Sequence, residues 1–153
     1  MLRIYVDTSV FGGMFDEEFS DISQRFFKQV SEGRFKLVTS AVVQQELEPA
    51  PEKVKQLFQK MLPLADIVSI EREALELQQA YITEGVVTAK SALDALHVAL
   101  ATVNGCDLII SWNFKHIVHF DKIPMYNAVN TLKNFGHIDI YSPREVIHYE
   151  EDI

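Results

Sequence analysis

Residues 2–7 read LRIYVD, a short β-rich run that ends in an aspartate. Four more runs of this type follow along the chain, and continuous apolar runs of this length are typical of strands that are covered on both faces. We therefore predict about five strands. They are LRIYV (2–6), FKLVT (35–39), DIVSI (66–70), DLIIS (107–111) and HIDIY (137–141).

Longer stretches with helical periodicity separate these runs. Alternating strands and helices predict an α/β protein, a three-layer α/β/α sandwich with a mostly parallel sheet. The chain shows no repeat and no linker, so we expect a single domain over 1–153. The predicted helices are 19–32, 41–62 with a kink or split at the prolines of EPAP (48–51), 71–84, 91–104, 124–134 and a final short helix in PREVIHY (143–149).

Local residue choices mark the helix ends. Ser91 and Asp94 have the S-x-x-D spacing of a capping box, in which each residue bonds the backbone at the start of a helix. Glycine is favoured just after a helix because it adopts positive φ without steric cost. The other predicted markers are the N-cap Ser40, Pro124 in a first turn, and the helix-ending glycines Gly33, Gly85 and Gly136.

The composition is that of a soluble globular protein, with 48% hydrophobic and 24% charged residues. The net charge of −8 argues against a protein that coats nucleic acid, because such binding depends on Lys and Arg neutralising phosphates. It does not argue against carboxylates that hold divalent cations. Part of the acidity lies in Glu150, Glu151 and Asp152, which we expect to form a solvated tail.

Sequence features also suggest a cellular location. The single cysteine, Cys106, excludes an intrachain disulfide and fits a reducing compartment, where we expect it to be a small buried residue. The start of the chain lacks the pattern of a signal peptide, and its apolar runs are too short to span a membrane. These features predict a cytoplasmic protein without a membrane partner.

Polar residues stand where the predicted strands end. Asp7 directly follows the strand at 2–6, Asn113 lies just after the strand at 107–111, and Glu46 lies on the helix after the strand at 35–39. In open parallel sheets, ligands bind beyond the carboxyl ends of the strands. We therefore expect these side chains to belong to a functional site.

The helix at 91–104 is apolar around almost its whole circumference, which predicts that it is buried. Asp94 and His97 nevertheless lie on one face of it, about 60° apart. A buried carboxylate is costly unless it is compensated, and 91–104 contains no Lys or Arg. A cation partner, a hydrogen-bond network or a metal remains possible; a divalent cation shared with Asp7 is the simplest of these.

Four stretches in this order resemble the motifs of PIN domains, above all those of VapC-type ribonuclease toxins of bacterial and archaeal toxin–antitoxin pairs. They are VDTSV (6–10), VVQQELEPA with Glu46, SALDALHVALA with Asp94, and LIISWNF with Ser111 and Asn113. The resemblance runs from Leu2 to about Val146. It implies a sheet order of 3-2-1-4-5, a metal-dependent ribonuclease, homodimers, and an antitoxin whose peptide covers the acidic pocket.

The resemblance assigns roles residue by residue. Asp7, Glu46 and Asp94 match the characteristic acidic positions, which are catalytic and metal-ligating. Asn113 stands where many members have an aspartate; an amide oxygen ligates Mg²⁺ without bringing charge, so one metal or two remain open. Oxygen ligands favour Mg²⁺ or Mn²⁺ over Zn²⁺. The expected supporting residues are Thr8, Ser9, His97 and Ser111, with Thr8 and Ser9 forming hydrogen bonds either to Asp7 or to a bound water.

Several residues near this site have two interpretations. Lys90, Lys115 and His116 either contact RNA phosphates or form an ordinary solvated surface. Trp112 and Phe114 either stack on bases or pack against neighbouring elements. His97 is interpreted as a hydrogen-bonded or packing residue that orients the site, with a catalytic base as the alternative.

We therefore expect a Mg²⁺- or Mn²⁺-dependent endoribonuclease; that it leaves a 5′-phosphate and is the toxin of a toxin–antitoxin pair is what the resemblance implies. The alternative is a PIN-like module that binds RNA or protein without catalysis, which Asn113 and the acidic charge motivate. A third candidate is another metal-dependent phosphoryl-transfer enzyme. The segment FGG (11–13) lacks the phosphate-loop pattern, so we expect no use of nucleoside triphosphates.

Overall fold

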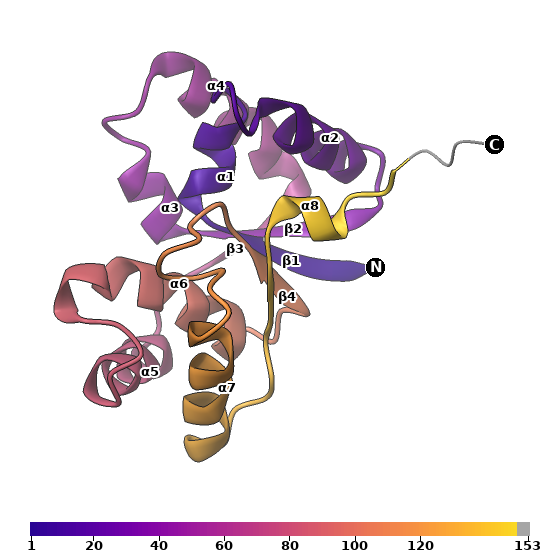
Figure 1. The fold of residues 1–153 in the computed structure, drawn as a ribbon. Coiled ribbons are helices and arrows are strands. Elements are labelled where there is room, and N and C mark those ends of the chain that lie inside the picture. The colour runs from indigo at the N-terminus through magenta and orange to yellow at the C-terminus, as the bar shows by residue number, and fades with distance from the viewer. Residues whose placement is uncertain (150–153) are drawn as a thin grey trace.

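A computed structural model describes residues 1–149 and contains a five-stranded sheet in the order β3-β2-β1-β4-β5 (Figure 1). All four strand pairings are parallel. This result confirms the predicted fold class and strand order. The strands are β1 Leu2–Val6, β2 Phe35–Ser40, β3 Ala65–Val68, β4 Leu108–Ile110 and β5 Asp139–Tyr141.

Strand β1 lies at the centre of the sheet, paired with β2 on one side and β4 on the other. The chain first builds outward from β1 through β2 to β3, and later returns to the other side of β1 to add β4 and β5. The strand order therefore reverses between β1 and β4. Ligand sites of open α/β sheets form at such a reversal, beyond the carboxyl ends of the strands.

Helices cover both faces of the sheet, as Figure 1 shows for the indigo-to-purple helices on one side and the pink-to-orange helices on the other. Side chains of a strand alternate between the faces. Ile4 and Val6 of β1 accordingly join one core cluster, whereas Tyr5 between them joins the other. The first cluster includes residues of α1 Thr8–Gly13, α2 Ser20–Ser31 and α4 Glu52–Met61, and the second those of α5 Arg72–Thr83, α6 Ala92–Val103 and α7 Lys122–Leu132.

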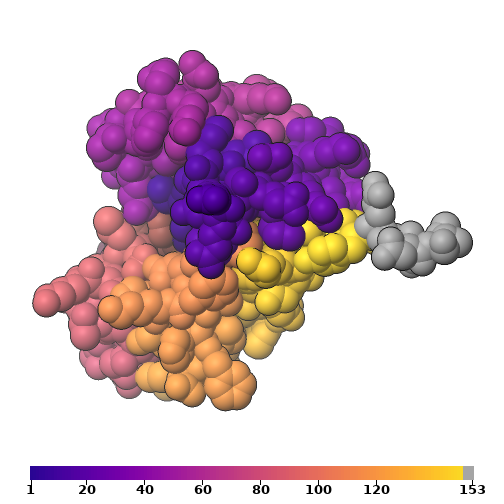
Figure 2. Space-filling view, turned by 45° about the horizontal axis from the view of Figure 1, so that its top comes forward, coloured from indigo at the N-terminus to yellow at the C-terminus, as the bar shows by residue number. Residues whose placement is uncertain are grey.

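The remaining helical segments are short. Helix α3 (Ala41–Glu46) follows β2 directly and contributes Val42 to one core cluster and Val43 to the other. Helix α8 (Pro143–Val146) follows β5, and the 3₁₀ turns are Leu62–Leu64 and Ala89–Ser91. In the space-filling view, the indigo and purple segments meet the pink and orange ones along the middle of the visible face (Figure 2).

The structure divides the predicted helix 41–62 and adds one helix that the sequence did not reveal. α3 ends at Glu46 and α4 begins at Glu52, with Pro49 and Pro51 between them, so the predicted split is confirmed. Helix α1 was not predicted; its six residues are too few for helical periodicity to be recognised. The other strands and helices lie within a few residues of their predicted bounds.

Two predicted helix signals are wrong. Ser91 occupies the N-cap of α6, but its side chain makes no capping hydrogen bond, so no capping box forms with Asp94. The segment after α7 turns at Asn134, which has φ 65°, and not at Gly136. By contrast, Ser40 caps α3 by accepting from the backbone N–H of Val43 at 3.5 Å. The predicted turns at Gly33 and Gly85 have the expected positive φ.

Two further expectations concern burial. Helix α6 is buried from Ala95 to Ala101 as predicted, although Leu93 in its first turn is exposed. Cys106 is buried, also as predicted.

Within residues 1–149, no helix is both long and apolar enough to cross a bilayer. The acidic tail Glu150, Glu151 and Asp152 lies outside the described residues.

Candidate active site

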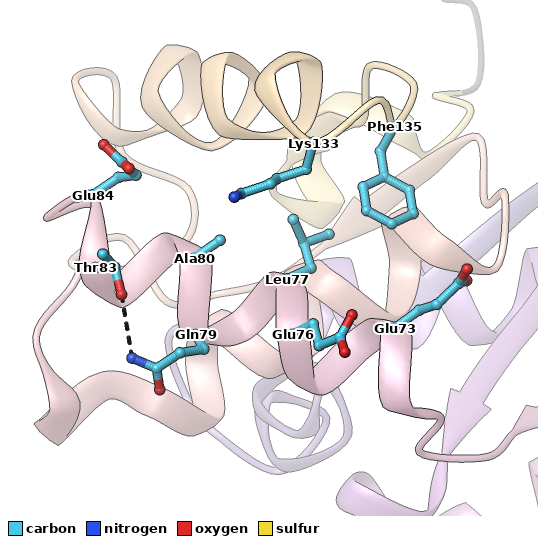
Figure 3. A pocket seen from close by; sticks show the side chains of 9 residues that line it. All are labelled: Glu73, Glu76, Leu77, Gln79, Ala80, Thr83, Glu84, Lys133 and Phe135. Carbon is cyan, nitrogen blue, oxygen red and sulfur yellow. Dashed lines mark hydrogen bonds between the residues drawn. The ribbon is translucent and has the colours of Figure 1, made fainter.

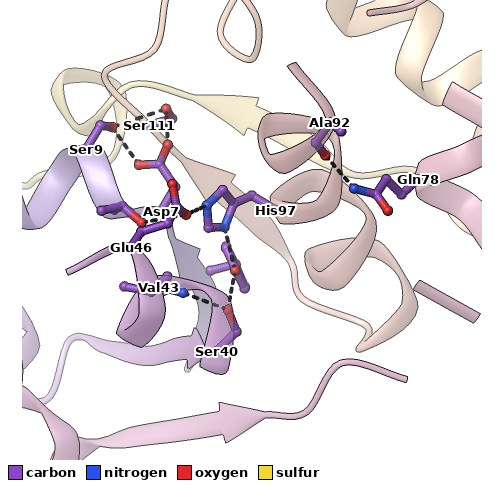
Figure 4. Close-up of polar contacts among 11 residues, drawn as sticks. Asp7, Ser9, Ser40, Val43, Glu46, Gln78, Ala92, His97 and Ser111 are labelled. Atoms are coloured by element: carbon purple, nitrogen blue, oxygen red, sulfur yellow. Dashed lines mark hydrogen bonds and ion pairs between the residues drawn. The ribbon is translucent and has the colours of Figure 1, made fainter. Parts of the chain in front are cut away.

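The polar residues predicted from sequence come from separate elements that meet beyond the carboxyl ends of β1 and β4. Asp7 follows β1, Ser111 follows β4, and Glu46 is the last residue of α3. Figure 4 shows the side chains of Asp7, Glu46, His97 and Ser111 pointing toward one another. The fold thus brings together residues that are up to about a hundred positions apart, at the strand-order reversal.

The Asp7 carboxylate is buried and is held by two serine hydroxyls. Ser9 Oγ donates to Asp7 Oδ1 and Ser111 Oγ donates to Asp7 Oδ2, each at 2.6 Å. The hydroxyls in turn accept backbone N–H groups, Ser9 that of Trp112 and Ser111 that of Asn113, both at 2.9 Å. The loop after β4 therefore fixes the carboxylate that follows β1.

The expectation for Ser9 as a donor to Asp7 matches this geometry, whereas Thr8 contacts a different carboxylate. Asp7 stands at the N-cap position of α1, yet its side chain makes no capping hydrogen bond. The side chain of Asp7 therefore does not act as a helix cap. Both of its oxygens are directed to the site.

Burial raises the pKa of the Asp7 carboxyl above its ordinary value. The charge of His97 and the hydrogen bonds of Ser111 and Ser9 act in the opposite direction, and the charge of Glu46 raises the pKa further. The net shift is upward. Ionised Asp7 is thus incompletely compensated by the protein, and a cation close to it would be stabilising.

Glu46 is compensated much better. Its Oε1 accepts from His97 Nε2 at 2.5 Å and from Thr8 Oγ1 at 3.0 Å. Burial alone raises the pKa of Glu46, but the hydrogen bond and charge of His97, together with the Thr8 bond, outweigh burial and leave the pKa below its ordinary value. Glu46 is therefore a carboxylate at neutral pH.

His97 is buried, and both of its ring nitrogens have partners. Nε2 contacts Glu46, and Nδ1 lies 2.7 Å from the hydroxyl of Tyr5. Tyr5 was not among the residues selected from sequence, because it appears there as one member of an apolar strand. A tyrosine two residues before Asp7, on the same face of β1, is the signal that could have identified it.

Asp94 lies in the first turn of α6 and is partly buried. Burial raises its pKa; the charges of His116 and His97 and a hydrogen bond from Asn113 lower it, and the charge of Glu46 raises it further. The net shift is upward. His116 is partly buried and its charge acts on Asp94; its interpretation as a phosphate contact or a surface residue stays a prediction.

The side-chain oxygen of Asn113 closes the turn after β4. Oδ1 accepts the backbone N–H groups of Lys115 at 3.2 Å and His116 at 3.0 Å. These two bonds hold the turn and use the oxygen of Asn113, which leaves its amide NH₂ as a donor group.

Trp112 packs in the interior and offers no open ring face. It stacks on Phe19 with ring centroids 4.3 Å apart, carries the Arg144 guanidinium 5.6 Å from its centre, and donates from Nε1 to Ser23 Oγ at 3.0 Å. Gly13 lies so close that an added Cβ would come within 2.7 Å of the ring. The packing interpretation therefore holds for Trp112, and base stacking does not. Phe114 is 46% exposed, and Lys90 and Lys115 are exposed.

The oxygen donors fit a hard divalent cation in kind. Three carboxylates affect one another electrostatically, and within residues 1–149 no Lys or Arg nitrogen lies within 4.0 Å of Asp7, Glu46 or Asp94. These side chains do not form a preorganised metal site. The described part of the chain contains no group of three or more His, Cys, Asp or Glu side chains placed to hold a metal. Side-chain rotation is therefore needed for joint ligation.

A groove of about 490 Å³ between α5 and the end of α7 is separate from this site (Figure 3). Lys133 and Phe135 point toward Leu77 and Ala80 of α5, and glutamates line the groove. None of the predicted site residues lines it.

An open parallel sheet with carboxylates gathered at its strand-order reversal defines a class of α/β domains with an acidic site. Comparison with family models assigns the chain within that class: residues 4–122 match the PIN domain, and the chain belongs to the PIN-domain family. No curated protein matches the chain.

Solved structures share the fold at low sequence identity. FitAB bound to IR36 DNA fragment has a TM-score of 0.60 at 14% identity and covers 98% of this chain and 99% of that one. VapBC2 from Rickettsia felis, bound to a DNA fragment from their promoter, has a TM-score of 0.56 at 11% sequence identity. The match covers 91% of this chain and 97% of that one. VapC20 of Mycobacterium tuberculosis, a Sarcin-Ricin loop cleaving toxin, has a TM-score of 0.57 at 14% sequence identity. The match covers 74% of this chain and 92% of that one.

Proposed function

We propose that this PIN-domain protein is a metal-dependent endoribonuclease and the toxin of a toxin–antitoxin pair. The observation that carries the proposal is that Asp7 and Glu46 lie at the strand-order reversal, with the charge of Glu46 acting on both Asp7 and Asp94, and with no Lys or Arg of residues 1–149 paired to the three carboxylates. Membership of the PIN family and the fold shared with a Sarcin-Ricin loop cleaving toxin support the same activity.

The three carboxylates would hold Mg²⁺ or Mn²⁺. The bound ion would activate a water molecule and stabilise negative charge on the phosphate oxygens during cleavage to a 5′-phosphate product. The protein itself supplies orientation. Ser9 and Ser111 fix Asp7, and His97 and Thr8 fix Glu46.

The RNA would approach over the loop that follows β4. Phe114 takes the stacking role that Trp112 cannot perform, because its ring is half exposed next to Asn113, with Trp112 and Phe19 packed behind it. Lys90 and Lys115 are exposed and would contact phosphates. Base–aromatic stacking contributes about 1–3 kcal/mol, so Phe114→Ala should raise the KM for a short RNA roughly tenfold or more.

The proposed protein partners are an antitoxin and a second copy of the chain. The acidic site and the net charge of −8 favour an antitoxin that places a basic side chain among the carboxylates. Solved complexes named FitAB and VapBC2 share the fold and support this proposal. Light scattering of the isolated chain tests for the homodimer.

The decisive experiment is cleavage of defined RNAs with and without Mn²⁺, using Asp7→Asn and Asp94→Asn. Both variants should lose cleavage while they keep the far-UV spectrum of the folded chain. Glu73→Gln, on α5 outside the site, is the matched control and should cut like wild type. The proposed site is wrong if either site variant cuts RNA at the wild-type rate.

A second candidate is a PIN-like module that binds RNA or protein without catalysis. Two observations favour this candidate. The Asn113 oxygen accepts backbone N–H groups of its own turn, and the described residues contain no preorganised metal site. Calorimetric titration with Mn²⁺ separates the two candidates. Heat of binding that disappears in Asp94→Asn supports the nuclease, and its absence in wild type supports the module.

A further inference from the structure

A chain of hydrogen bonds runs through the core from β2 to the candidate site (Figure 4). Ser40 Oγ accepts the N–H of Val43 and lies 2.8 Å from the Tyr5 hydroxyl. Tyr5 lies 2.7 Å from His97 Nδ1, and His97 Nε2 lies 2.5 Å from Glu46 Oε1. Ser40, Tyr5 and His97 are at most 2% exposed, so solvent does not compete for these bonds.

The groups at the two ends, an acceptor at Glu46 and a donor at Val43, fix the direction of the chain. Glu46 is ionised and only accepts, so His97 Nε2 carries a hydrogen. Burial raises the pKa of Tyr5, which therefore keeps its single hydrogen. At the other end, the Val43 N–H already donates to Ser40 Oγ.

One assignment then satisfies every group: Ser40 donates to Tyr5, Tyr5 donates to His97 Nδ1, and His97 donates from Nε2 to Glu46. In this assignment Nδ1 is an acceptor and Nε2 is a donor. A hydrogen on Nδ1 would turn the Tyr5 hydroxyl toward Ser40, and the Ser40 hydrogen would then have no acceptor among the bonds of the described residues.

We propose that His97, oriented by Tyr5 and Ser40, is the positioning residue for Glu46, holding one carboxylate oxygen and leaving the other for a divalent cation. This inference rests on the proposed function for the cation and on the hydrogen bonds for the positioning. His97 is not a general base, because Nδ1 accepts from Tyr5 and Nε2 carries its hydrogen toward Glu46.

The arrangement couples two carboxylates to one strand. Tyr5 lies on β1, and Asp7 directly follows this strand with an extended backbone, so the side chains of these alternate residues extend to the same side. Because Tyr5 orients His97 and His97 holds Glu46, the position of β1 sets both Asp7 and Glu46. The buried histidine of α6 thus acts on a residue of α3 through a hydroxyl of β1.

The test measures Mn²⁺ affinity by calorimetry in the full chain. Partners that orient metal ligands typically contribute 10- to 100-fold in affinity, so His97→Ala should weaken binding by roughly that factor. His97→Gln should recover most of the loss, because the Gln Nε2 group donates where the imidazole Nε2 does. Tyr5→Phe should weaken binding by about tenfold.

Tyr81→Phe is the matched control, since it also removes a buried tyrosine hydroxyl, here bonded to Asn130 at 2.5 Å. It should leave Mn²⁺ affinity unchanged, which separates positioning from a general loss of stability. The positioning role is overturned if Tyr5→Phe binds Mn²⁺ as Tyr81→Phe does, or if Gln restores nothing that Ala removed.

A second readout needs no metal. Nitrogen NMR of the metal-free chain should show the hydrogen of His97 on Nε2 and Nδ1 as an acceptor, and Tyr5→Phe should shift the Nδ1 resonance. A hydrogen on Nδ1 contradicts the proposal. If wild type binds no Mn²⁺ and cuts no RNA, the proposed function fails, and the tautomer then decides whether Tyr5 orients His97 toward Glu46.

Discussion

Asp7 and Glu46 are two carboxylates of one site with opposite electrostatic surroundings. Asp7 is deeply buried, is held by serine hydroxyls and has a raised pKa. Glu46 is half-buried, is held by His97 and Thr8 and has a lowered pKa. Burial outweighs the two hydroxyl donors at Asp7, whereas the hydrogen bonds from His97 and Thr8 outweigh the lesser burial of Glu46.

Before a cation binds, the protein stabilises the charged form of Glu46 but not that of Asp7. The ionised Asp7 carboxylate opposes folding and gains most from a nearby cation. Glu46 is already stabilised by the protein and mainly needs orientation. The following variants test this division of roles, from the largest expected effect to the smallest.

Asp7→Asn and Glu46→Gln should each reduce RNA cleavage about a thousandfold, since loss of a metal ligand removes several kcal/mol of transition-state stabilisation. Their stabilities should move apart. Asp7→Asn should unfold at a higher temperature than wild type, and Glu46→Gln at a lower one. Calorimetric melting of both variants checks the sign, and a common direction for both would contradict the comparison.

Ser111→Ala should destabilise the chain by about 1.5–3 kcal/mol, the range for hydrogen bonds to charged groups, because Asp7 Oδ2 loses its donor in the interior. Urea unfolding measures the difference. Ser69→Ala is the control: Ser69 also donates to a carboxylate, that of Glu71 at 2.6 Å, but on the surface. Its cost should stay below about 0.5 kcal/mol, and equal costs would show that burial of Asp7 is unimportant.

The pH dependence of stability should differ in sign between the two carboxylates. A group with a raised folded-state pKa binds more protons when folded, so Asp7 lowers stability as pH rises above its ordinary pKa of 3.8. Glu46, with a lowered pKa, contributes stability above its ordinary value of 4.5 and loses it as pH falls through the folded-state value.

Unfolding free energies of wild type and variants at several pH values measure this contrast. The gain from Asp7→Asn should grow as pH rises from about 4, and the loss from Glu46→Gln should shrink as pH falls toward about 3. Parallel pH profiles for the two variants would show that the two carboxylates share one environment.

Thr8→Ala should have the smallest effect, a loss of about 0.5–1 kcal/mol, because its partner Glu46 is partly exposed and keeps the His97 bond. Urea unfolding again provides the measurement. A loss as large as that of Ser111→Ala would mean that Thr8, and not His97, is the main support of Glu46.

Most of the fold was predictable because strand runs, helix periodicity and proline breaks are local properties of the chain. β1 at 2–6, the split of 41–62 and the turns at Gly33 and Gly85 follow from neighbouring residues. Helix α1 did not follow, since six residues are too short to show a period. Gly136 was a wrong helix end because glycine permits positive φ but does not require it.

The sequence by itself also identified Asp7, Glu46 and Asp94 as candidates, because they follow strands or interrupt an apolar helix. Only the tertiary structure decided what each side chain contacts. In the folded chain, Trp112 is buried in contact with Phe19 and Arg144. The Asn113 oxygen accepts the backbone N–H groups of its own turn.

The Tyr5–His97–Glu46 connection is the clearest example of a feature that the tertiary structure decided. Tyr5 and His97 are 92 positions apart, and His97 and Glu46 are 51 apart. Local patterns report which face of an element a residue occupies. Hydrogen-bond partners depend on which faces the packed sheet and helices bring within about 3 Å, a property of the assembled fold.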